Sequence, residues 1–159
     1  MTMHMVEHSL LTSLLAPALV LAFGGAVPRP RVGVAWGLFV GTLWTLNVPG
    51  VLDRISMRPL AEVAAGLVVL AVSMLFWAPL LNRRAPLRGL AAGAYLITAG
   101  MATDLIGAWY MAMGETAAGV VMVVGMLPLG VAAVVLTWLG LVSEERSAVR
   151  WESSADAAR

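Results

Sequence analysis

Apolar residues run through this chain in five long stretches that carry almost no charge, and short polar segments separate them. The stretches cover residues 9–27, 32–52, 59–81, 89–113 and 116–142. About 20 apolar residues are needed for a helix to cross the hydrocarbon core of a bilayer. The pattern therefore predicts an all-α, polytopic membrane helix bundle with about five transmembrane helices.

The composition supports this class of protein. Of the 159 residues, 60% are hydrophobic and 12% are charged, whereas globular domains average about 25% charged residues. The chain has no cysteine, which excludes disulfides and iron–sulfur clusters. A net charge of +1 gives no reason to expect nucleic acid as a partner. We predict a transmembrane bundle over residues 1–142 and a polar, disordered cytoplasmic tail over 143–159.

The basic residues, which are all arginines, predict the orientation. With five spans, the loops after the first and third spans share a side with the C-terminal tail. That side holds Arg29, Arg31, Arg83, Arg84, Arg88, Arg146, Arg150 and Arg159, and the other side holds Arg54 and Arg58. Arginines accumulate on the cytoplasmic side of membrane proteins. We therefore expect a multi-pass protein of the inner (plasma) membrane with its N-terminus outside and its C-terminus in the cytoplasm.

Two histidines near the N-terminus are the first candidates for chemistry. His4 and His8 are four residues apart, so a helix places both imidazoles on one face, one turn apart. Methionines surround them in the sequence, and a set of imidazoles and thioethers favours Cu(I) over harder ions. The sequence predicts a copper site with His4 and His8 as first ligands.

Methionines extend this prediction. Seven of the ten fall in the outer half of the predicted spans, and we nominate Met3, Met5 and Met122 as auxiliary ligands. Glu62 and Glu115 also lie in the outer half of the predicted bundle, at the depth of these methionines. The alternative interpretation is that methionine fills irregular gaps between helices, as it does in many cores.

Two polar residues lie inside the predicted spans. Asp104 interrupts the fourth span and Asn47 lies near the end of the second. A charged residue within a membrane helix indicates function by default, although a hydrogen bond to a neighbouring helix explains either residue equally well.

Glycines recur at regular spacing in two spans. Gly33, Gly37 and Gly41 repeat every four residues, and Gly93, Gly100 and Gly107 repeat every seven. Such spacing lets a neighbouring helix approach closely.

Residues 4–8 also match H-x-x-E-H, a zinc peptidase pattern with two ligands and a general base. A hydrolase would need a third metal ligand and a water-filled cleft. For the third ligand, the sequence offers only Glu62 or Glu115. We predict that the protein is not an enzyme.

Several segments resemble one family in the same order along the chain. Residues 3–8 contain a helix opening H-M-x-x-H, 75–79 an F-W-x-P helix end, and 118–122 an A-G-x-x-M motif. Residues 46–53 resemble a W-H-x-P-x-x-x-D stretch, and Tyr95-Leu96 opens a span as in the same family. Together they resemble the multi-span CtaG-like cytochrome c oxidase assembly proteins. The resemblance implies a membrane protein that helps to supply copper to the oxidase on the outer side.

The chain departs from this family in four ways. Two further N-terminal spans are expected, so the chain resembles a shortened, diverged member, or one whose start is placed late. Asn47 replaces a family histidine, another histidine is missing near Ala65 and Gly66, and the outer loop before the last span is short. The function predicted is Cu(I) handling at the outer face, with membrane lipid and cytochrome c oxidase subunits or another membrane protein as partners. The alternative is a metal-free structural subunit of a respiratory membrane complex.

Overall fold

In a computed structural model, the described part of the chain consists of helices and their connections. The structure describes the backbone of residues 2–23, 26–48, 50–82 and 87–157, and the side chains of 6–23, 26–48, 50–51, 54–55, 57–82 and 87–147. The elements are α1 (Thr2–Leu10), the π-helical turn η1 (Leu11–Leu15), α2 (Ala16–Phe23), α3 (Val32–Leu46), α4 (Val51–Ser56), α5 (Pro59–Leu81), α6 (Gly89–Ala112) and α7 (Thr116–Ala157). The predicted all-α class is confirmed.

Within these residues, four apolar segments are long enough to cross a membrane, and one is shorter. The long ones are Val6–Phe23, Pro59–Leu81, Gly89–Ala112 and Thr116–Ser147, and the shorter one is Val32–Leu46. At 1.5 Å per residue, the 15 residues of α3 span only about 22 Å. The protein is a helical membrane bundle.

The second predicted span is corrected at its C-terminal end. We expected helix over 32–52, but α3 ends at Leu46, and Asn47 follows it as the capping residue. Two residues further along the sequence, Pro49 disfavours the α-conformation in Val48 before it, and Gly50 has a positive φ of 83°. These residues end the helix and separate α4 from α3.

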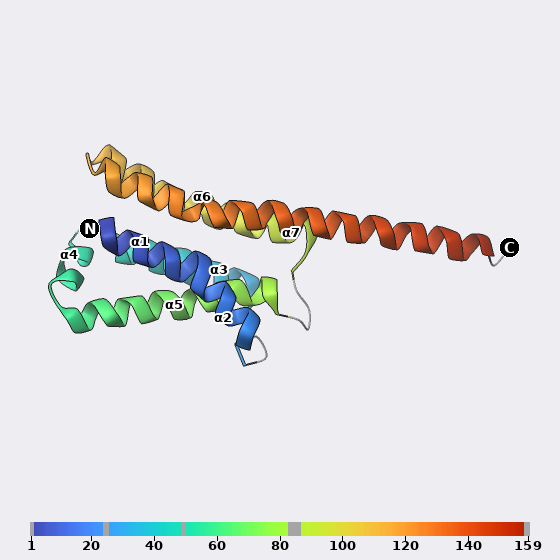
Figure 1. The fold of residues 1–159 in the computed structure, drawn as a ribbon, viewed down its shortest axis with the longest axis horizontal. Coiled ribbons are helices and arrows are strands. Elements are labelled where there is room, and N and C mark those ends of the chain that lie inside the picture. Colours follow the sequence, from blue (N-terminus) through green and yellow to red (C-terminus); the bar gives the residue numbers. More distant parts are fainter. Residues whose placement is uncertain (1, 24–25, 49, 83–86, 158–159) are drawn as a thin grey trace.

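The last helix is longer than predicted. We expected it to end at residue 142 and a disordered tail to follow, but α7 continues to Ala157. Residues 143–157 include no glycine or proline, and they contain alanine, glutamate and arginine, which favour helix. In Figure 1 this part of α7 extends well beyond the other helices.

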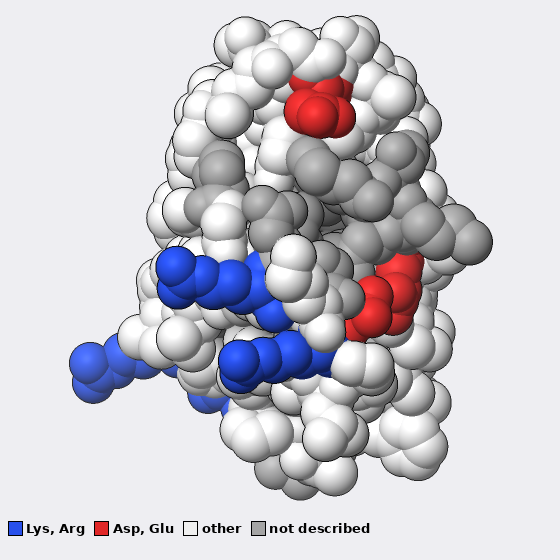
Figure 2. Space-filling view, turned by 90° about the vertical axis from the view of Figure 1, so that its left-hand side faces the viewer, with Lys and Arg blue, Asp and Glu red and all other residues white. Residues whose placement is uncertain are grey.

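The helices pass back and forth along one direction (Figure 1). The N-terminus, α4 and the α6–α7 turn lie at one end, which we call the N-terminal end. The α2–α3 and α5–α6 connections lie towards the opposite end, and the C-terminus lies beyond them. Figure 2 views the N-terminal end, where a few basic and acidic side chains stand among uncharged ones.

Hydrogen bonds hold the first span against α5, and stacked aromatic rings join α5 to α3 and α6. Pro17 lacks an N–H group, and the N–H of Ala16 bonds to the carbonyl of Leu11, which makes the turn π-helical. This leaves the Thr12 carbonyl to accept a bond from the Trp77 indole at 2.9 Å. Deeper in the core, the Phe76 ring stacks on the rings of Phe39 and Tyr95, with centroid distances of 4.1 Å and 4.8 Å. Stacking of this kind is favourable for buried rings.

Glycines join α6 and α7, as the seven-residue spacing predicted in part. A Cβ at Gly107 would lie 2.9 Å from the carbonyl oxygen of Gly119, and one at Gly93 would collide with Thr137. Gly100, between them, has no such neighbour within 4 Å, and the same is true of Gly33, Gly37 and Gly41 in α3. Within the described chain, the predicted packing face of α6 is therefore used in part, and that of α3 is not used for close helix packing.

Candidate metal centre

His8 lies in the last turn of α1 and is buried, with 6% of its surface exposed. Thr12, one turn later on the same face, is fully buried and its hydroxyl accepts a hydrogen bond from Ser73 of α5 at 3.2 Å. The helix face that carries His8 therefore points into the bundle. A metal ion would bind the neutral form of this imidazole.

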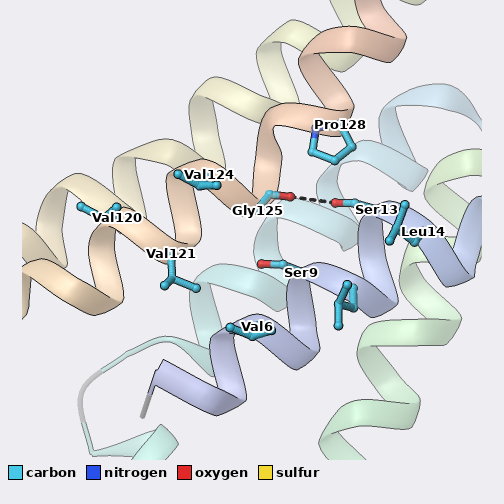
Figure 3. A pocket seen from close by; sticks show the side chains of 10 residues that line it. Val6, Ser9, Ser13, Leu14, Val120, Val121, Val124, Gly125 and Pro128 are labelled. Atoms are coloured by element: carbon cyan, nitrogen blue, oxygen red, sulfur yellow. Dashed lines mark hydrogen bonds between the residues drawn. The ribbon is translucent and has the colours of Figure 1, made fainter.

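The first and last spans meet next to His8. A Cβ on Gly125 would collide with the side chain of Ser9, and the Ser13 hydroxyl donates a hydrogen bond to the Gly125 carbonyl at 3.0 Å. The two helices run in the same direction (Figures 1 and 3). Because Ser9 follows His8 directly, His8 and the residues around Gly125 lie at the same depth.

Two buried methionines flank that contact on α7. Met122, which the sequence nominated, is 5% exposed, and Met126, which it did not, is 6% exposed. They are four residues apart and share one helix face. The same four-residue spacing that singled out the two histidines would have found Met126, had it been applied to methionine as well.

The other nominated ligands fall outside the described side chains. His4, Met3 and Met5 lie on the helical backbone of α1, so His4 is one turn from His8 along the helix, as predicted. The position of the His4 imidazole and of the two thioethers lies outside what the structure describes.

Other residues predicted at this level do not all gather at His8. Glu115 is exposed and Glu62 is half-buried, while Met57 and Met113 are exposed by 81% and 56%. Exposed thioethers at the surface of the bundle cannot complete a site around a buried imidazole. Met122 and Met126 are the buried thioethers among the described methionines at this depth.

The two positions where the resemblance implies further histidines also lie near this end. Asn47 is buried, and its backbone carbonyl accepts a hydrogen bond from Tyr110 at 2.8 Å. Ala65 is buried, and a Cβ on Gly66 would lie 3.8 Å from the carboxylate of Glu7. These positions hold no imidazole, so any copper site here would rely on the histidines of α1 and on thioethers.

A groove between the first span and α7 runs beside this centre (Figure 3). Its volume is about 420 Å³, and Val6, Ser9, Leu10, Ser13, Leu14, Val120, Val121, Val124, Gly125 and Pro128 line it. The lining is apolar except for two serines, one of which already bonds to α7. Such a surface suits lipid acyl chains and offers no metal ligand.

Asp104 lies apart from the candidate centre, inside α6. Its Oδ1 atom is buried and accepts no hydrogen bond in the described part of the structure, while the rest of the side chain is partly exposed. An ionised aspartate at the centre of a membrane helix costs roughly 2.5–3.5 kcal/mol on the insertion scale. The sequence suggested either a functional role for Asp104 or a structural hydrogen bond to a neighbouring helix. No described hydrogen bond within the chain supports the structural role.

Among the described residues, no three histidine, cysteine, aspartate or glutamate side chains come together as a metal-binding group. Comparisons with protein-family models, with characterised proteins and with solved structures found no match to this chain. The fold therefore defines the class, a helical membrane bundle, and the function rests on the residues themselves.

Proposed function

We propose that the protein handles Cu(I) at the outer face of the plasma membrane, as a non-enzymatic protein that resembles the CtaG-like oxidase assembly family. One observation carries the proposal. The contact of Ser9 with Gly125 places buried His8 at the depth of the buried thioethers Met122 and Met126.

The donor set suits copper in its reduced state. Imidazole nitrogen and thioether sulfur are soft enough to prefer Cu(I) to magnesium or calcium. Low exposure keeps competing water away from these donors. His4, one helical turn from His8, would supply the second nitrogen, and Met3 or Met5 the remaining thioether. In this role the copper ion is cargo, and the oxidase or one of its subunits is the partner that receives it.

The test is copper binding by the purified protein in detergent, with Cu(I) supplied under reducing conditions. The parent should bind copper, and His4→Ala with His8→Ala should abolish binding. Met122→Leu together with Met126→Leu should weaken it, since leucine keeps the volume and removes the sulfur. Because imidazole must be neutral to bind, affinity should fall as the pH is lowered.

Met74→Leu is the matched control, because Met74 is a half-buried methionine of α5 in the half of the span away from His8. It should bind copper as the parent does. If the double histidine variant retains copper, or if the parent binds none, the proposal fails and the metal-free structural subunit replaces it.

A further inference from the structure

The face of α6 around Asp104 has features that the copper proposal does not use. Asp104 is the only charged residue in α6 (Gly89–Ala112). It lies eight residues before the end of the helix, about 12 Å into the span. Its Oδ1 is buried without a hydrogen bond in the described part of the chain, and the side chain is partly exposed at the surface of the bundle.

Small residues stand one turn away on both sides of this carboxyl group. Gly100 and Ala108 are four residues before and after Asp104, so the three share one face of the helix. Ala108 is exposed, and a Cβ on Gly100 would meet no neighbour within 4 Å. In membranes, small residues at this spacing let a second helix approach closely.

The neighbouring helix leaves the same place open. Gly107 packs against Gly119, and Gly93 packs against Thr137, so the antiparallel register puts Gly130 of α7 close to the level of Gly100. A Cβ on Gly130 would also meet no neighbour within 4 Å. Asp104 is thus one helical turn from Gly100, and neither Gly100 nor Gly130 is used in close packing within the described chain.

Charge decides what could cover this surface. Lipid acyl chains offer no hydrogen-bond donor. A second copy could bring no cation, because the apolar spans of this chain contain no arginine or lysine. A cation on another protein's helix would satisfy the carboxylate at a depth where water does not.

We propose that Gly100, Asp104 and Ala108 form a docking surface for a transmembrane helix of another protein, which carries an arginine or lysine at the depth of Asp104. The surface does not include His8, Met122 or Met126. Copper binding and helix docking can therefore fail separately.

The probe is a synthetic polyleucine helix of about 20 residues with one arginine at the depth of Asp104, labelled with a fluorophore. The protein has no cysteine, so one added after Arg159 takes the second fluorophore, and energy transfer in lipid vesicles measures association. The parent should bind the arginine peptide at least tenfold more tightly than an all-leucine peptide. Asp104→Leu should remove this preference and leave copper binding unchanged.

Two variants separate docking from simple charge attraction. Asp104→Leu combined with Leu67→Asp moves the carboxylate to α5, where Leu67 is 62% exposed and lies eight residues after the start of the helix at Pro59. This variant should not recover the preference, because Val63, one turn away, is bulky and exposed. Gly100→Leu keeps the carboxylate but fills the open space, and it should weaken arginine-peptide binding about tenfold.

Three results would overturn the proposal. One is equal binding by the variant with the relocated carboxylate, and another is unchanged binding by Gly100→Leu. The third is self-association of the parent in the absence of peptide that Asp104→Leu abolishes, since the occupant would then be a second copy of this chain.

Discussion

Because Gly125 has no side chain, the first and last spans can touch at the candidate copper centre. A Cβ there would lie 2.6 Å from the Cβ of Ser9, so Gly125→Ala must push α1 and α7 apart. We expect a loss of about 1–3 kcal/mol in the free energy of unfolding, typical of overpacking, together with weaker Cu(I) binding. Reversible unfolding in mixed micelles and copper titration measure the two effects.

Gly130→Ala is the control for this prediction. Gly130 is in the same helix, and a Cβ there would meet no neighbour within 4 Å. Alanine is the better helix former by up to about 1 kcal/mol, so this variant should be as stable as the parent or slightly more stable. Equal losses from both substitutions would mean that the Ser9 contact does not determine the distance between the helices.

At the scale of whole elements, α7 makes the sharpest prediction. Nitroxide labels on Ser143→Cys and Asp156→Cys are thirteen residues apart, or about 20 Å along a continuous helix. Electron–electron distance measurements should give one narrow distribution near that value. Adding Arg150→Pro should broaden it, because proline breaks an interior helix. A broad distribution in the parent would restore the sequence-based expectation of a disordered tail.

Helix boundaries were predictable where a local signal marks them. Pro59 begins α5, and glycine or a polar residue lies next to the start of α6 and of α7, and these starts match the prediction. The end of α3 was missed because apolar residues continue beyond Leu46, although Asn47 and Pro49 were visible. The length of α7 was missed because polarity was taken to end the helix, whereas polarity marks only where a helix leaves the membrane.

The candidate centre was less predictable than the helices. His8 and Met122 were found from the sequence because residue type and spacing reveal potential ligands. That they lie at one depth depends on the contact of Ser13 with Gly125, which are 112 positions apart in the chain. Sequence periodicity describes one helix at a time, so it cannot predict which neighbouring helix packs against which glycine.

At the scale of the whole molecule, the distribution of arginines between the two ends predicts the orientation in the membrane. The alternation of spans in Figure 1 puts Arg54 and Arg58 at the N-terminal end, and Arg29, Arg31 and Arg88 towards the other. We expect the N-terminal end to face outwards. The chain lacks cysteine, so Met57→Cys should react with a membrane-impermeant maleimide in intact cells, whereas Ser147→Cys should react only after permeabilisation. The reverse pattern would invert the topology and move the copper centre to the cytoplasmic side.

The parallel contact between the first and last spans also constrains how the protein is made. Ribosomes add about 5–20 residues per second, so the 112 positions between Ser13 and Gly125 correspond to roughly 6–20 s of synthesis. During that interval α7 has not been completed, so the thioethers of Met122 and Met126 are not yet in place at the depth of His8. A nascent chain arrested before Thr116 would carry both histidines and yet lack the wall that α7 provides. If the proposed copper centre is correct, such an arrested chain should bind Cu(I) more weakly than one that includes α7.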